Sequence, residues 1–198
     1  MTQIKTFRGG KLMRVKLLNA LQAVDQDFLP PLSQRKPLEF WISLFEKGTI
    51  LIAIEEEKAA ISGFLAYYPS LNGQIYEELR ACVNLGPVLT STDTHEVFQG
   101  AYLHFIAVTP EFRGKEVGSL LMKALLDDAQ RNGISQMRVI TWSTNVTSLN
   151  LYRKYGFQIF KQVPNDRGSG VGSVYLEAKF PFPLILDEMN LLERSVSL

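Results

Sequence analysis

The spacing of apolar residues along the chain predicts a series of helices and strands. Apolar residues recur at three- and four-residue steps between Leu12 and Phe28, which is typical of one face of an amphipathic helix. Pro30-Pro31 ends this helix, and a second helix is expected after Pro37, ending at Gly48. Apolar and β-branched runs predict strands at 2–7, 49–55, 59–68, 101–108, 136–142, 157–163 and 171–179, and helical spacing predicts helices at 117–129 and 147–155.

The order of these elements predicts a mixed α/β sheet. The helix 117–129 stands between the strands 101–108 and 136–142, so these strands are expected to be parallel and joined by a right-handed crossover. The polar turn 55–58 and the turn-rich segment 164–170 each join two strands into an antiparallel hairpin.

The length of 198 residues fits a single domain. Residues 1–48 are expected to form a strand and two helices, 49–180 the core, and 181–198 a tail that is apolar at its start. The tail is expected either to pack on its own domain or to bind a partner, and a homodimer is one open alternative. The connection 69–100 is long for a compact domain, and connections of this length usually carry function or small elements of their own.

Charge and cysteine content exclude several kinds of partner. Lys and Arg together number 21 and Asp and Glu 20, so the chain offers no basic field for nucleic acid. The single cysteine, Cys82, excludes a cysteine-based zinc site, and with only two histidines no metal site is expected. No run approaches the ~18 apolar residues of a membrane span, and the N-terminus lacks the pattern of a secretory signal. The protein is therefore expected in the cytoplasm, away from membranes.

The segment 108–119 combines features of an anion-binding site. A strand ends, a glycine-containing loop follows and a helix begins, so free backbone N–H groups lie at the positive end of the helix dipole. Gly114 and Gly118 allow a phosphate to approach the backbone, and Arg113 and Lys115 add positive charge. The alternative is an ordinary strand-to-helix turn. The G-x-G-x-x-G pattern of dinucleotide-binding folds and the Gly-Lys-Ser/Thr of a P-loop are both missing.

Two motifs lie within residues 101–157. The first is the run from Arg113 to Gly118, which follows a strand and enters a helix, and the second is the run from Asn145 to Phe157. They resemble the Arg/Gln-x-x-Gly-x-Gly/Ala and Asn-x-x-Ala/Ser-x-x-x-Tyr-x-x-x-Gly-Phe motifs of the GNAT superfamily of acyl-CoA-dependent N-acyltransferases. Neither motif is specific alone, but their order and separation together make the resemblance specific.

The resemblance implies a fold and an activity. The fold is a mixed, mostly antiparallel seven-stranded sheet with a central parallel pair that splays apart, flanked by helices. The activity is transfer of an acetyl group from acetyl-CoA, as cosubstrate, to a primary amine. Direct attack in a ternary complex is expected, because no cysteine lies near the expected thioester.

The resemblance also implies which residues hold the coenzyme. Backbone groups of Ile106 and Val108, with Ala107 between them, pair with the pantetheine arm as an added strand would. Asn145 contacts the pantetheine or adenosine portion, and Ser148 is also expected at the coenzyme. Backbone N–H groups hold the pyrophosphate, and they belong to Arg113, Gly114, Lys115, Glu116, Val117, Gly118 and Ser119.

Tyr152 is expected, from the second motif, to protonate the leaving thiolate. A phenol with a pKa near ~10 is a suitable acid for a thiolate of similar basicity. The alternative is that Tyr152 is a packed aromatic on a short amphipathic helix.

His104 is a candidate general base, since an imidazole titrates near neutral pH and the attacking amine must lose a proton. Strand alternation predicts that Tyr102, His104 and Ile106 share one face of the sheet. The alternative is that His104 fills the sheet face with its hydrogen bonds satisfied.

One residue departs from the family pattern, because Glu116 stands where the first loop glycine is usual. One interpretation is that its carboxylate faces solvent in the first turn of the helix, where an acidic residue suits the dipole. The other is that it weakens or abolishes coenzyme binding, since a carboxylate beside a pyrophosphate is unfavourable.

The acceptor is expected to lie against residues 11–47 and 69–100. The length of the second segment favours a small molecule, such as an amino sugar, an amino acid or a polyamine. One alternative is a protein N-terminal or lysine acetyltransferase. Another is a non-catalytic acyl-CoA-binding protein, which Glu116 would explain.

Overall fold

The computed structural model describes residues 2–7, 11–27, 44, 47–71, 75 and 98–180. The helix expected after Pro37, most of the connection 69–100 and the tail 181–198 lie outside the described residues.

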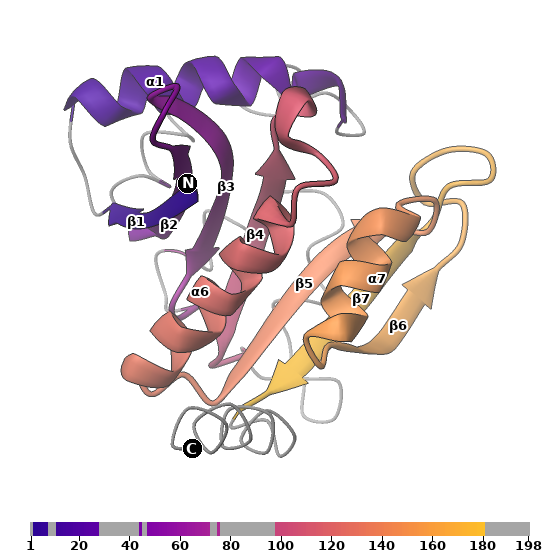
Figure 1. The fold of residues 1–198 in the computed structure, drawn as a ribbon. Helices are drawn as coiled ribbons and strands as arrows, with labels where there is room; N and C mark the ends of the chain where they lie inside the picture. Colours follow the sequence, from indigo (N-terminus) through magenta and orange to yellow (C-terminus); the bar gives the residue numbers. More distant parts are fainter. Residues whose placement is uncertain are drawn as a thin grey trace, which may run out of the picture.

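The described chain forms one mixed sheet with helices on both faces (Figure 1). The helices are α1 (Lys11–Ala23), α6 (Val117–Arg131) and α7 (Val146–Lys154), with short 3-10 helices η1 (Asp25–Asp27) and η2 (Pro110–Phe112). The strands are β1 (Thr2–Phe7), β2 (Thr49–Glu55), β3 (Ala60–Tyr68), β4 (Ala101–Val108), β5 (Gln136–Trp142), β6 (Gln158–Val163) and β7 (Ser173–Lys179). The strands and later helices lie close to their predicted positions, whereas α1 ends at Ala23, earlier than predicted.

The sheet has seven strands in the order β1-β2-β3-β4-β5-β7-β6. β4 and β5 are parallel, as the intervening helix predicts, and every other neighbouring pair is antiparallel. The predicted mixed sheet with a central parallel pair is confirmed.

β4 and β5 pair over only a short part of their length. Their register covers Ala101–Leu103 opposite Met137–Val139, although β4 continues to Val108 and β5 to Trp142. Beyond Leu103 the two strands diverge, which Figure 1 shows as a gap that widens toward the carboxyl ends of both strands. The central pair is therefore splayed, as expected.

A β-bulge at His104 accompanies this divergence. Leu103 stands opposite Tyr67 while Phe105 stands opposite the adjacent Ala66, so His104 is an extra residue on β4. A bulge bends its strand and disrupts the local ladder, which fits the end of β4–β5 pairing at the preceding residue.

The bulge overturns the prediction that Tyr102, His104 and Ile106 share one face. Tyr102 and Phe105 belong to the same core cluster, whereas Ile106 packs against the cluster on the other face. The extra residue shifts the alternation by one position, so simple period-two counting fails beyond His104.

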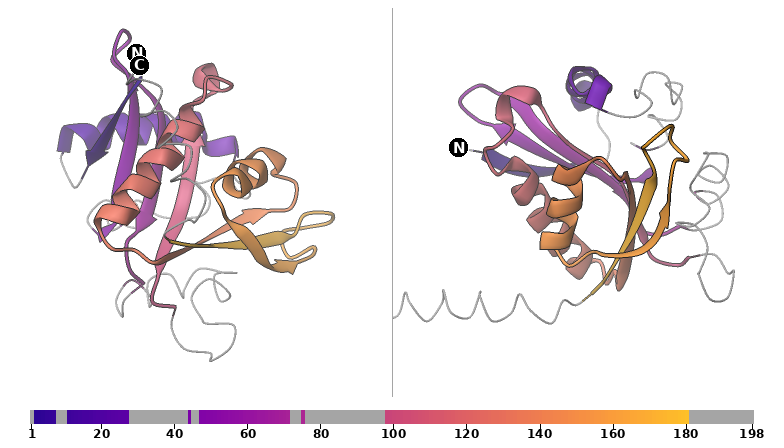
Figure 2. Two further views of the ribbon diagram at one scale, coloured as in Figure 1. Left: turned by 60° about the horizontal axis from the view of Figure 1, so that its bottom comes forward. Right: turned by 90° about the vertical axis from the view of Figure 1, so that its right-hand side faces the viewer.

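Each face of the sheet has its own apolar cluster, and the helices divide between them (Figures 1 and 2). α6 and α7 cover one face, through residues such as Val117, Leu121 and Leu149. α1 covers the other through Leu17, Ala20 and Leu21, and Val24 directly after the helix belongs to the same cluster. No described helix has the length and apolar character needed to cross a membrane.

Gly63 in β3 allows the beginning of α6 to approach the sheet closely. A Cβ atom at this position would lie 2.9 Å from both the Ala107 carbonyl oxygen and Val117 Cγ1, and 3.2 Å from Leu121 Cδ1. Such contacts are too short for a side chain, so this position requires glycine. The N-terminus of α6 thereby lies directly against β3 and β4.

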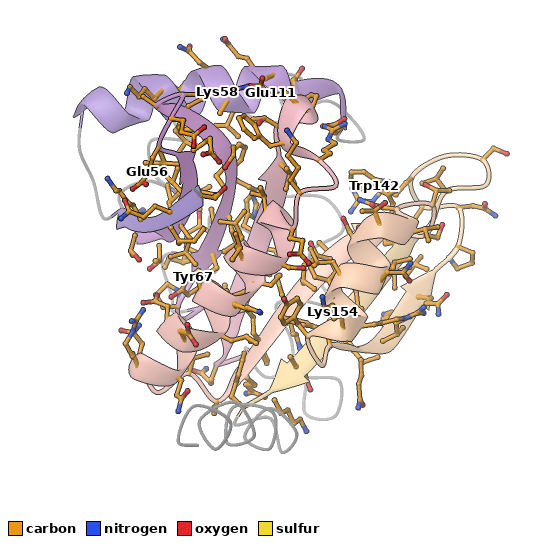
Figure 3. The ribbon with its side chains drawn as sticks, viewed as in Figure 1. Glu56, Lys58, Tyr67, Glu111, Trp142 and Lys154 are labelled. Carbon is orange, nitrogen blue, oxygen red and sulfur yellow. The ribbon has the colours of Figure 1, made fainter. Side chains whose placement is uncertain are left out.

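The other half of α6 is held by a buried polar pair. The Tyr67 hydroxyl of β3 donates a hydrogen bond to the Asp128 carboxylate of α6, and both side chains are buried. Figure 3 shows Tyr67 lying between β3 and α6. Asp128 also accepts a 3.3 Å bond from Arg131, so the carboxylate is satisfied despite its burial.

We expect Gly63→Ala to lower the free energy of unfolding by about 1–3 kcal/mol, because the added methyl group overpacks the junction of β3, β4 and α6. Urea unfolding followed by circular dichroism measures the change. The matched control is Gly118→Ala, where a Cβ would lie 3.5 Å from Leu151 Cδ2 and 3.8 Å from Val108 Cγ2, ordinary contact distances. The control should retain full stability, and wild-type stability in Gly63→Ala would contradict the packing argument.

Candidate functional site

The carboxyl end of β4 has a backbone edge that faces the gap beside β5. The Thr109 N–H donates to the Ser62 carbonyl of β3 at 3.0 Å. Because a trans peptide places its C=O opposite its N–H, the Val108 carbonyl points away from β3. The Ala107 carbonyl lies close to Gly63 of β3, so the N–H of Val108 also points away from β3.

The backbone N–H and C=O groups of successive residues in a strand point alternately to its two sides. Because those of Ala107 point toward β3, those of Ile106 point toward the same open edge as those of Val108. β5 pairs with β4 only as far as Leu103. The N–H and C=O groups of Ile106 and the N–H of Val108 thus lie on an edge that β5 leaves open. An extended chain with amide groups can bind such an edge as an added strand.

The β4–α6 loop, residues 109–116, places the N-terminus of α6 next to this edge. Gly114 has φ +74°, and a Cβ there would meet no atom within 4 Å, so backbone conformation rather than space favours glycine. Glu116 is the N-cap of α6 and also adopts the left-handed region, with φ 59°. A non-glycine residue in this region is strained by roughly 1–2 kcal/mol, which explains why glycine is usual at this position of the motif.

The Glu116 side chain is exposed and makes no side-chain capping bond. The expectation that it faces solvent agrees with this exposure, although it lies at the N-cap rather than within the first turn. Its backbone carbonyl accepts the Leu120 N–H at 3.0 Å, so α6 begins regularly despite the substitution.

Phe112 of η2 anchors the β4–α6 loop to the apolar cluster under α6, with 4% of its surface exposed. The ammonium groups of Lys58 and Lys115 lie 5.5 Å and 5.3 Å from the centre of its ring. Lys58 also pairs with Glu111 at 3.9 Å, and Figure 3 shows these two side chains next to each other. Lys115 is therefore a local cation of the loop, although the loop as a whole has no net charge, because Glu111 and Glu116 balance Arg113 and Lys115.

α7 contacts the beginning of α6. The position of a Cβ at Gly118 lies near Leu151 of α7 and Val108 of β4, so the three elements meet there. The Tyr155 hydroxyl donates to the Ser119 carbonyl at 3.0 Å, which connects the end of α7 to the first turn of α6. Tyr155 was not identified from the sequence, because it differs in no local feature from a packed aromatic.

Asn145 and Ser148 have a structural role that explains their spacing. The Asn145 side-chain oxygen accepts the backbone N–H of Ser148 at 3.1 Å and so caps the N-terminus of α7. This capping satisfies one of the free donors of the first turn. Their contacts with a coenzyme stay predictions.

Tyr152 lies on the inner side of α7, with 4% of its surface exposed, and its ring centre is 5.8 Å from that of Phe157. Burial raises the pKa of its hydroxyl well above the ordinary value for tyrosine, because the phenolate would be desolvated. The group therefore keeps its proton throughout the neutral and mildly alkaline range.

His104 lies on the face that α1 covers, whereas Tyr152 belongs to the face under α6 and α7. Its ring centre is 5.5 Å from those of Tyr102 and Phe105 and 6.1 Å from that of Tyr68. The candidate acid and the candidate base thus lie on opposite faces of the sheet.

Arg138 of β5, a buried charged residue on the same face as Tyr102, was also missed by sequence reasoning. Its Nε donates to Glu177 of β7 at 2.8 Å, and its guanidinium lies 4.0 Å and 4.7 Å from the ring centres of Phe98 and Phe160. The ion pair and the two rings satisfy a charge that would otherwise be costly to bury.

Arg113 of the β4–α6 loop contacts two other segments. Its Nε donates to the Val108 carbonyl at 3.2 Å, and its Nη2 pairs with the carboxylate of Asp27 in η1. The sequence does not indicate the contact between Asp27 and Arg113, since the two residues are 86 positions apart.

Comparison with known proteins shows which family the chain is similar to. The sequence model of the acetyltransferase (GNAT) family matches residues 18–157, more than half of the chain. The chain belongs to this family. The match extends from within α1 to Phe157, three residues after the end of α7, and includes both motifs.

Among relatives of this GNAT protein, the L-methionine sulfoximine/L-methionine sulfone acetyltransferase of Pseudomonas aeruginosa is 36% identical over 69 residues, 35% of this chain and 40% of the relative. N-alpha-acetyltransferase 30 of Dictyostelium discoideum is 27% identical over 57% of this chain and 55% of its own length. These matches span less than two thirds of either relative. Thialysine N-epsilon-acetyltransferase of Bos taurus is 31% identical over 58% of this chain and 71% of its own length.

The fold is also that of solved GNAT structures. A GNAT acetyltransferase from Elizabethkingia anophelis with acetyl-CoA bound superposes with a TM-score of 0.56, covering 90% of this chain and 98% of that one at 17% identity. At this identity the likeness concerns the fold alone.

We expect Glu116→Gln to leave the affinity for acetyl-CoA within about twofold of the wild type, because an exposed carboxylate is screened by solvent and salt. Glu116→Gly should likewise preserve affinity, and it should raise the free energy of unfolding by about 1 kcal/mol by relieving the left-handed strain. Calorimetric titration and urea unfolding measure the two effects. An affinity more than tenfold tighter in Glu116→Gln would show that the carboxylate faces the coenzyme.

Proposed function

We propose that this protein transfers an acetyl group from acetyl-CoA to a primary amine of a small molecule, by direct attack in a ternary complex. The observation that carries the proposal is the open backbone edge at Ile106 and Val108 beside the N-terminus of α6. An amide-bearing arm suits the edge, and a diphosphate suits the free N–H groups and positive dipole of the helix.

The residues of the chain fit acetyl-CoA at this place. The loop backbone allows close approach at Gly114, and Arg113 and Lys115 supply local positive charge. The exposed Glu116 side chain leaves the backbone groups accessible. When bound, the coenzyme supplies an activated acetyl thioester.

Tyr152 is proposed as the acid that protonates the leaving thiolate. Its raised pKa keeps the hydroxyl protonated, and a thiolate formed in the same apolar surroundings is destabilised by the same desolvation. Transfer of the proton from the phenol to the sulfur therefore becomes favourable as negative charge develops on the sulfur.

His104 is proposed as the base that accepts the proton of the amine, directly or through a water molecule. The bulge places it at the point where β4 and β5 separate, on the face opposite Tyr152. In this proposal the acid and the base act from opposite faces of the sheet.

The acceptor is proposed to be an amino acid or a similar small amine. Three relatives bear names that specify small amino compounds: methionine sulfoximine or sulfone, thialysine and ornithine. A second candidate is a protein N-terminus, which the similarity to N-alpha-acetyltransferase 30 favours. Assays with free amino acids, polyamines and N-terminal peptides distinguish the two. Turnover restricted to peptides would contradict the small-molecule proposal, and coenzyme binding without turnover on any amine would point to a non-catalytic protein.

We expect Tyr152→Phe to lower kcat by about 10²–10⁴-fold, the usual contribution of a general acid, with little change in the KM for acetyl-CoA. Because the wild-type hydroxyl stays protonated, kcat should not fall between pH 8 and 10 through ionisation of Tyr152. Steady-state kinetics across this range measure both effects. Tyr175→Phe, which alters a buried tyrosine on the other face, is the control, and an equal loss in both variants would contradict a specific role for Tyr152.

We expect His104→Gln to lower kcat by about 10²–10⁴-fold with little change in the KM for acetyl-CoA, because the amide side chain cannot accept the proton of the amine. Steady-state kinetics at saturating acetyl-CoA measure the effect. A kcat equal to that of the wild type would exclude His104 as the base.

A further inference from the structure

An ion pair covers the end of the edge that the proposed function assigns to the coenzyme. Arg113 donates through Nε to the Val108 carbonyl at 3.2 Å, and through Nη2 it pairs with Asp27. The Val108 carbonyl is on the side of β4 that faces away from β3, as its peptide geometry requires. The guanidinium therefore lies at the open edge, and Asp27 holds it there from η1.

This arrangement opposes coenzyme binding in two ways. The Arg113 guanidinium already occupies the Val108 carbonyl, which an amide-bearing arm added to the edge would need as an acceptor. The Asp27 carboxylate also neutralises a cation that would otherwise attract a diphosphate at the N-terminus of α6.

We propose that the Asp27–Arg113 pair is an internal competitor of acetyl-CoA, which covers the open edge of β4 in the free protein and is displaced when the coenzyme binds. The proposal rests on the proposed function, because it takes the edge as the coenzyme site. In this proposal Asp27, which follows α1 in the chain, weakens acetyl-CoA binding by holding Arg113 at the edge.

The exposure of the pair makes displacement feasible. The side chains of Arg113 and Asp27 are 48% and 44% exposed, so solvent and salt weaken their attraction. A pair of this kind can be broken at small cost. Its removal should change coenzyme affinity by about two- to fivefold.

The test is a calorimetric titration of the full chain with acetyl-CoA at low and at high salt. Asp27→Asn removes the charge while keeping the shape of the side chain, and it should bind acetyl-CoA about two- to fivefold more tightly at low salt, with the gain shrinking at high salt. Asp27→Glu retains the charge and should behave like the wild type.

Two further variants separate the pair from the general field of the protein. Glu111→Gln removes a carboxylate of the same loop that pairs with Lys58 and not with Arg113, so it should give a smaller gain than Asp27→Asn. In an Arg113→Gln background, Asp27→Asn should have no effect beyond that of Glu111→Gln, because the residue through which Asp27 acts is gone.

Unchanged or weaker binding by Asp27→Asn would overturn the proposal, and so would an equal gain in Glu111→Gln. If the wild type binds acetyl-CoA and Asp27→Asn binds it no more tightly, this proposal is overturned and the proposed function is not. Binding in neither the wild type nor Asp27→Asn would overturn the proposed function as well, whereas binding in the variant only would support both.

Discussion

The central constraint of the structure is the incomplete pairing of β4, which pairs with β5 only as far as Leu103, the residue before the bulge at His104. Backbone N–H and C=O groups need partners, and a sheet normally supplies them from both neighbouring strands. Here β3 supplies partners on one side as far as Thr109, while β5 stops pairing at Leu103. The carboxyl half of β4 therefore has backbone groups that neither neighbouring strand pairs, and this is the edge that we propose for the coenzyme.

The rest of the fold holds the N-terminus of α6 at that edge. Gly63 permits the close approach, the Tyr67–Asp128 pair fixes the far half of the helix, and Tyr155 connects its first turn to α7. These contacts place the N-terminus of α6 beside the edge of β4, which the proposed coenzyme site needs. The chain is almost neutral overall, so in this proposal the attraction of an anionic coenzyme comes from the local arrangement.

Much of the fold was predictable from the sequence, and the reasons for the remainder are physical. Apolar spacing located the strands and the later helices, and the helix between β4 and β5 predicted their parallel pairing. The bulge was not predictable, because one polar residue within an apolar strand does not mark an extra residue, and only the pairing with β3 shows that His104 is one. The two motifs located the loop, Asn145 and Tyr152. The Tyr155–Ser119 and Asp27–Arg113 contacts join residues 36 and 86 positions apart, and no local pattern encodes them.

The most direct test of this account is amide hydrogen exchange of β4, measured by NMR with and without saturating acetyl-CoA. We expect the Ile106 and Val108 amides to exchange faster than the Thr109 amide in the free protein, because the Thr109 N–H donates to Ser62 whereas the other two face the gap. Acetyl-CoA should protect Ile106 and Val108 specifically. Saturable binding that left both amides unprotected would contradict the claim that the coenzyme binds the open edge of β4.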